Sequence, residues 1–116
     1  MLGMRSHDDV KQEYERALVR LGSGPSAHEH VVMSATRDAL AWVLGLTDVA
    51  PWTGRYMPNP SARELFNEWS KAETVNHDSA LMHEDRDRFT YGSAVEHALA
   101  WARGSSTNAP TQLGWG

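Results

Sequence analysis

Two stretches of this chain have nearly the same sequence. Residues 38–51 read DALAWVLGLTDVAP and residues 97–110 read HALAWARGSSTNAP, in register and without a gap. Seven positions are identical at a constant offset of 59 residues: Ala39/Ala98, Leu40/Leu99, Ala41/Ala100, Trp42/Trp101, Gly45/Gly104, Ala50/Ala109 and Pro51/Pro110. Because this offset is about half of the 116 residues, the repeat predicts a chain built from two similar halves.

Each half is predicted to contain two helices, whose starts are marked by capping residues. Ser26 and Ser61 are each followed three residues later by a glutamate, Glu29 and Glu64, which is the pattern of a capping box. The first helix is expected to begin near residue 6 or 8, and the repeat places the start of the fourth at Asp85, the equivalent of Ser26. Apolar residues then recur at spacings of three and four, as on one face of a helix.

The repeated residues also predict how the second and fourth helices end and meet. A glycine stands in each copy where a C-terminal cap needs a residue without Cβ, and Ala-Pro follows it. Small alanines would let the two helices approach closely, and the tryptophans would cover the ends of their contact. The structural repeat therefore consists of Ala39, Trp42 and Gly45 in the first copy and of Ala98, Trp101 and Gly104 in the second.

These patterns predict an all-α fold, a four-helix bundle-like domain built from two helical hairpins related by an internal duplication. No segment alternates apolar and polar residues long enough to indicate a strand. We expect a single domain over residues 1–116, with hairpin repeat 1 at about residues 6–51 and hairpin repeat 2 at about residues 61–110. The third helix is expected to kink or end near residue 76, and residues 105–116 to form a flexible surface tail.

The two copies differ most where the chain leaves the repeat. The first copy carries apolar residues there, Leu44, Leu46 and Val49, and the second carries polar ones, Arg103, Ser105 and Asn108. The sequence therefore predicts that the exit of the first copy is buried and that of the second is exposed.

Composition excludes several classes of function. The chain has no cysteine, so disulfides, thiolate zinc sites and a cysteine nucleophile are ruled out. A formal net charge of −4 argues against a general nucleic-acid-binding protein, which needs a concentrated basic face. We expect a cytoplasmic protein without membrane association, because neither a signal peptide nor a long apolar run is present in these residues.

The segment between the two halves carries the residues expected to bind a partner. It is bracketed by prolines and reads APWTGRYMPNP over residues 50–60. Large apolar side chains in such a loop either pack onto the body or contact another protein. The predicted partner-binding residues are Trp52, Arg55, Tyr56 and Met57.

Six histidines raise the alternative of a metal site. His77-Asp78 resembles the paired ligands of HD-type metal phosphohydrolases, which are all-helical, and His83 and Asp87 have the helical spacing i, i+4 that could share an ion. The resemblance implies a metal-dependent phosphohydrolase, whereas the other reading of these residues is that they are solvated and hold no metal.

Two acidic residues of the third helix invite a further comparison. Glu64 and Glu68 share a helix face, as in helical nucleotide pyrophosphatases, but the E-x-x-E pattern of that family is lacking. Lys71 is close enough in sequence to pair with Glu68 as an ordinary surface charge. No nucleotide-binding, serine-hydrolase or zinc-protease motif occurs in the sequence.

A resemblance to a group of proteins rests on the repeat. The pattern A-L-x-W-x-x-G followed by A-P, with YGSAV at residues 91–95 and APWTGR at residues 50–55, is similar to that of small uncharacterised helical proteins of actinobacteria and their bacteriophages. The resemblance implies such an origin and no particular activity. We expect a non-enzymatic accessory protein that needs no cofactor and binds a protein partner or a second copy of itself as a homodimer. The alternatives are the phosphohydrolase and a nucleic-acid-binding regulator, whose binding would depend steeply on salt.

Overall fold

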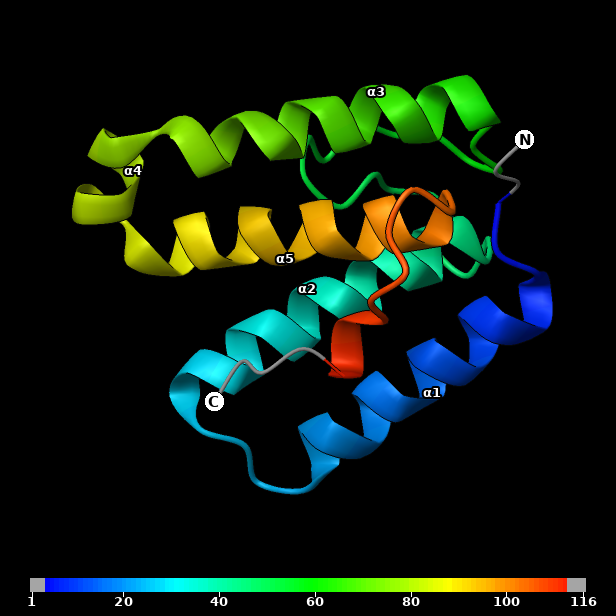
Figure 1. Cartoon of the computed structure of the whole chain (residues 1–116), viewed down its shortest axis with the longest axis horizontal. Coiled ribbons are helices and arrows are strands. Elements are labelled where there is room, and N and C mark those ends of the chain that lie inside the picture. The colour runs from blue at the N-terminus through cyan, green and yellow to red at the C-terminus, as the bar shows by residue number, and fades with distance from the viewer. Residues whose placement is uncertain (1–3, 113–116) are drawn as a thin grey trace.

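The long helices of the structure begin at side chains that cap their first turns. The computed structural model describes residues 4–112, and these residues are all-α (Figure 1). The helices are α1 (His7–Gly22), α2 (Ala27–Val43), α3 (Ala62–Glu73), α4 (Ser79–Glu84) and α5 (Arg86–Ala102), with 3-10 helices η1 (Thr74–His77) and η2 (Pro110–Gln112). Ser6, Ser26, Ser61 and Asp85 each accept a hydrogen bond from the backbone N–H three residues on. The predicted all-α class and the four predicted helix starts are confirmed.

The third helix ends early, as its sequence pattern suggests. After Glu73 the chain tightens into the 3-10 turn η1, and the side chain of Asp78 then caps α4 by accepting a bond from the Leu81 N–H. Of the two predicted capping boxes, the one at Ser61 is complete, because Glu64 also accepts a bond from the Ser61 N–H at 2.8 Å.

The helices lie in the order α3, α5, α2 and α1 across the molecule (Figure 1). α2 and α5 make the most extensive contact, α1 packs on α2, and α3 packs on α5. Small residues face this central contact, since Ala39 and Ala98 are fully buried. The second and fourth long helices therefore pack together at the centre, as the alanine pattern predicts.

α2 and α5 end in the same hydrogen-bonded turn. Gly45 and Gly104 have φ of 78° and 79°, the left-handed region that a residue with a Cβ rarely adopts. The N–H of each glycine donates to the carbonyl of the tryptophan three residues before it, Trp42 or Trp101. The N–H of the residue after each glycine donates to the carbonyl of the alanine that precedes that tryptophan. This pair of bonds is a Schellman motif in both helices. The roles predicted for the repeated glycines are confirmed.

The expectation for the exit of the first copy is wrong for Leu46 and Val49, whereas Leu44 is half-buried against the core and Ser105 and Asn108 of the second copy are exposed. Leu46 is 63% exposed and Val49 47% exposed, although both are apolar. The turn at Gly45 directs the chain outward, and Ala50 and Trp42 fill the interior instead. Apolar character alone does not decide which side of an exit loop faces the core.

The expectation of a flexible tail from residue 105 is also wrong for its described part. Ala109, Pro110 and Thr111 are buried, and η2 packs against α1, α2 and α5. The start of the chain lies close by, because the side chain of Arg5 donates to the carbonyls of Trp101 and Ser106. Residues 113–116 of the predicted tail lie outside the described residues. Over residues 4–112, no helix is long and apolar enough to cross a lipid bilayer.

Candidate functional site

The segment between α2 and α3, residues 44–61, is ordered by its own backbone bonds. The Ala50 N–H donates to the Arg55 carbonyl at 2.9 Å, and the Met57 N–H donates to the Asp48 carbonyl at 2.6 Å. These bonds flank an isolated antiparallel bridge between Val49 and Tyr56. Directly opposed residues of such a bridge project their side chains to the same face. Val49 and Tyr56 therefore stand side by side. We call this segment the crossover segment.

A buried carboxylate fixes the crossover segment to the body of the protein. Glu68 of α3 is only 4% exposed and accepts three hydrogen bonds from the turn at residues 52–53. The N–H groups of Trp52 and Thr53 donate to its Oε2 at 2.7 and 2.8 Å, and the Thr53 hydroxyl donates to its Oε1 at 2.9 Å. The prediction that Glu68 is a surface charge paired with Lys71 is wrong, because the loop supplies donors that the helix pattern does not reveal.

A second glutamate holds the other exit loop in the same way. Glu13 of α1 is fully buried, and its Oε2 accepts bonds from the Thr111 N–H at 2.6 Å and from the Thr111 hydroxyl at 2.7 Å. Arg16 also donates to Oε1 of Glu13 at 3.2 Å. The helical pattern did not predict that Glu13 or Glu68 binds a loop, although each lies seven residues after its helix cap, at Ser6 or Ser61.

The structure divides the four predicted partner-binding residues into two pairs. Trp52 and Met57 are half-buried and pack against the core, and the Met57 carbonyl accepts a bond from the Trp42 Nε1–H at 2.9 Å. Arg55 and Tyr56 are exposed, and Tyr56 is 75% accessible. The first pair holds the crossover segment in place, and the second faces outward.

The ring of Trp52 occupies a position that only a glycine leaves open. A Cβ at Gly92 of α5 would lie 2.9 Å from Cζ3 of Trp52 and 3.0 Å from Cγ2 of Val75. Inside a helix, alanine is about 1 kcal/mol more favourable than glycine. At Gly92, however, the added Cβ would have to displace the Trp52 ring.

We therefore expect Gly92→Ala to lower the melting temperature despite the better helix propensity. Overpacking of this kind costs about 1–3 kcal/mol, which exceeds the propensity gain. Gly22→Ala at the end of α1 is the matched control, since a Cβ there meets nothing within 4 Å. Thermal unfolding followed by circular dichroism compares the two. A Gly92→Ala protein as stable as the control would show that Trp52 moves freely.

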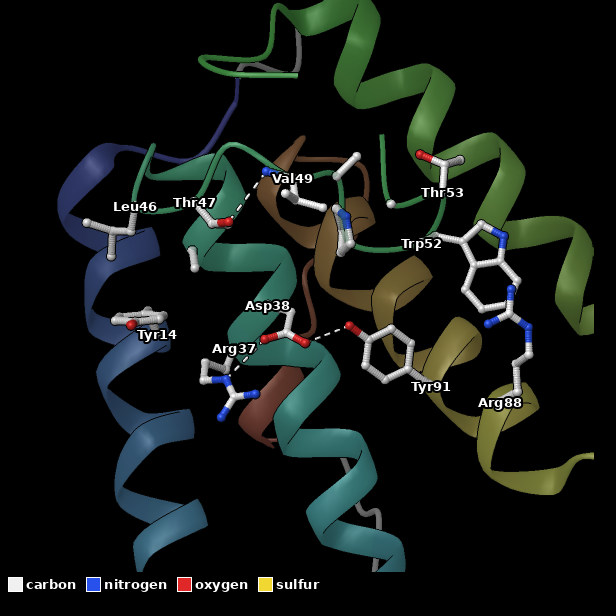
Figure 2. Close-up of a pocket in the computed structure, with 14 residues that line it drawn as sticks. Tyr14, Arg37, Asp38, Leu46, Thr47, Val49, Trp52, Thr53, Arg88 and Tyr91 are labelled. Carbon is white, nitrogen blue, oxygen red and sulfur yellow. Dashed lines mark hydrogen bonds and ion pairs between the residues drawn. The ribbon is translucent and has the colours of Figure 1, made fainter. Parts of the chain in front are cut away.

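A cleft of about 520 Å³ opens beside the crossover segment. Figure 2 shows Tyr14 and Leu46 on one side of it, Trp52 and Arg88 on the other, and Asp38 between them. Side chains from α1, α2, α5 and the crossover segment line the cleft. This volume lies within the range of known ligand-binding pockets.

The floor of the cleft is a hydrogen-bonded group of three side chains. The Tyr91 hydroxyl donates to Oδ2 of Asp38 at 2.6 Å, and Nε of Arg37 donates to Oδ1 at 3.1 Å (Figure 2). Burial, followed by the bond to Asp38 and its charge, raises the pKa of Tyr91. The tyrosine hydroxyl is therefore a donor at neutral pH, and each oxygen of Asp38 accepts one hydrogen bond.

Arg88 is arranged differently from Arg37. Its guanidinium lies 4.4 Å from the centre of the Trp52 ring, and within residues 4–112 it forms no ion pair. Stacking on an aromatic face leaves the N–H groups at the edge of a guanidinium free to donate. Arg37 donates to Asp38 through its Nε, and this bond does not use its terminal nitrogens. The cleft thus carries two arginines and one aspartate, and the aspartate is paired with Arg37.

The histidines and acids considered for a metal do not converge. Among residues 4–112, no three His, Asp or Glu side chains are placed to hold one ion. His77 Nε2 instead lies 3.1 Å from Oε1 of Glu73, and Asp78 caps α4. His83 and Asp87 are exposed on either side of the break between α4 and α5.

Comparison with known proteins adds nothing to this picture, because no family model, curated protein or solved structure matches the chain.

Proposed function

We propose that this chain is a non-enzymatic binding protein whose partner contacts the crossover segment. The observation that carries the proposal is an ordered loop that exposes three apolar side chains: Val49 and Tyr56 are opposed across the bridge, and Leu46 lines the same cleft as Val49. We call these three residues the ridge. Exposed apolar groups that lie together mark interaction sites in soluble proteins. Tyrosine at the centre of such a surface is among the residues that most often contribute binding energy.

The ridge is held in one conformation in the absence of a partner. Glu68 binds the turn at residues 52–53, Trp42 binds the Met57 carbonyl, and the ring of Trp52 packs on Gly92. A loop that is already ordered loses little conformational entropy on binding, so more of the contact energy appears as affinity. These anchors therefore favour a binding role for the crossover segment over the role of a flexible linker.

We also infer that the scaffold is a duplicated helical hairpin, arranged like a four-helix bundle. Support comes from the two Schellman turns and from the two buried glutamates, Glu13 and Glu68, each of which binds the residues that follow an Ala-Pro. The first helices of the two halves align at an offset of 55 residues, from Ser6 and Ser61, rather than 59. The longer connection within the second hairpin, which contains η1 and α4, accounts for the difference.

The two halves differ at the cleft, which favours a special role for the first. At the position equivalent to Tyr14 the second half has Trp69, whose Nε1–H donates to Oε1 of Glu96 at 3.0 Å. Arg103 lies 5.0 Å from the centre of the same ring. In the first half the equivalent space remains an open cleft beside the apolar ridge.

Photo-crosslinking tests the proposal directly. A photoreactive phenylalanine analogue at Tyr56 is expected to form a covalent adduct in cells, and the same analogue at Met82 is not. Met82 of α4 is the control because it is an exposed apolar residue outside the crossover segment. The mass of the adduct distinguishes a second copy of the chain from another protein. Equal labelling at both positions, or none at Tyr56, would contradict the proposal.

Tyr56→Ser gives an independent prediction. Because Tyr56 is exposed, its removal should change the free energy of unfolding by no more than about 0.5 kcal/mol. Binding to the partner should weaken by about tenfold or more, as for a central interface tyrosine. Thermal unfolding and a binding titration measure the two effects separately. A large loss of stability would show instead that Tyr56 packs onto the body.

A further inference from the structure

The cleft beside the ridge indicates what kind of partner fits. Leu46 and Val49 belong both to the exposed ridge and to the lining of the cleft, so the apolar and the polar surfaces are continuous (Figure 2). At the other side of the cleft Arg88 lies over Trp52. A ligand that reaches from the ridge into the cleft would therefore meet apolar side chains first and the guanidinium of Arg88 next.

The geometry points to an acidic peptide segment as the occupant, with an aspartate or glutamate close to a large apolar residue. This inference rests on the proposed function and names the partner of the same surface. The acidic side chain enters the cleft and accepts hydrogen bonds from the guanidinium of Arg88. The apolar residue covers Val49 and Tyr56.

Charge complementarity carries this assignment. Arg88 is paired with no carboxylate within residues 4–112, while the carboxylate of Asp38 already accepts from Tyr91 and Arg37. Because Arg37 offsets the charge of Asp38, an incoming carboxylate meets one unpaired guanidinium, that of Arg88. Arginine binds carboxylates through two parallel N–H groups, and its stacking on Trp52 fixes the plane in which they point.

The shape of the surface favours a segment of a protein over a small molecule. The cleft is continuous with side chains that project outward, and Tyr56, three-quarters exposed, extends the apolar area through its pairing with Val49. Small ligands are instead mostly enclosed by their pockets. An extended peptide places alternate side chains on one face, which suits a ridge beside a cleft.

Selection from a phage-displayed library of random short peptides tests the inference with the whole chain as bait. We expect the selected peptides to share an acidic residue near leucine or phenylalanine. Titration of a synthetic selected peptide should show about tenfold weaker binding to Arg88→Gln than to the unaltered protein. Arg86→Gln is the matched control, since Arg86 is an exposed arginine of the same helix outside the cleft. It should bind as the unaltered protein does.

A mutant cycle separates direct contact from a structural role of Arg88. The peptide with its acidic residue changed to the amide should bind weakly to the unaltered protein, and no more weakly to Arg88→Gln. If the two losses add, Arg88 does not contact the carboxylate and the inference fails.

The remaining outcomes separate the inference from the proposed function. Selected peptides without acidic residues that still depend on Tyr56 would overturn the acidic partner and leave the binding function standing. Selected peptides insensitive to Tyr56→Ser, or no selected peptide, would overturn both.

Discussion

Glu68→Ala is expected to destabilise the protein by about 3 kcal/mol, because two half-buried backbone donors lose a charged acceptor. The N–H groups of Trp52 and Thr53 both bind this carboxylate, and the Thr53 hydroxyl binds it as well. The melting temperature should fall by about 10 °C. The crossover segment should also loosen, so trypsin should cleave after the exposed Arg55 far faster than in the unaltered protein.

Two variants make this test specific. Glu15→Ala removes an exposed carboxylate of α1 and should change stability by no more than about 0.5 kcal/mol. Thr53→Val removes only the hydroxyl, and its effect should couple to that of Glu68→Gln by more than about 0.5 kcal/mol. If Glu68→Ala melts at the same temperature as Glu15→Ala and still resists trypsin, Glu68 does not hold the loop.

The second large effect is expected at Trp42. Its side chain is fully buried in the core, and its Nε1–H donates to the Met57 carbonyl in the crossover segment. Trp42→Ala leaves a cavity and an unpaired carbonyl, and should cost about 4 kcal/mol. Chemical denaturation followed by circular dichroism measures the loss.

Smaller changes should separate packing from hydrogen bonding at this position. Trp42→Phe keeps most of the ring volume and loses the donor, so it should cost about 2 kcal/mol. Phe66→Ala serves as the control, because this aromatic residue is 45% exposed and its loss should cost less than about 1 kcal/mol. A Trp42→Ala protein as stable as Phe66→Ala would mean that the core closes around the missing side chain.

Local patterns predict the helices of this chain well because their causes are local. Ser26, Ser61 and Asp85 act as caps through bonds that span three residues, so the sequence alone reveals them. Gly45 and Gly104 end helices for an equally local reason, since the left-handed turn excludes a Cβ. The packing of α2 on α5 follows from the repeated alanines.

The candidate site is less predictable because its contacts join distant segments. Glu68 shares a helix face with the buried Leu65 and Ala72, but only the position of residues 52–53 supplies the donors that make it a buried acceptor. The bond between Tyr91 and Asp38 spans 53 residues. A direct comparison of the segments after Ser6 and Ser61 would have suggested the glutamates, because both contain an acid at the third position and a glutamate at the seventh.

The glutamate anchors cross between the two hairpins. Glu13 belongs to the α1–α2 hairpin and binds the loop after α5, whereas Glu68 belongs to the α3–α5 hairpin and binds the loop after α2. Neither hairpin contains the acceptor that its own exit loop requires. We therefore expect the two hairpins to unfold as one cooperative unit, because melting of either would leave the exit loop of the other without its acceptor.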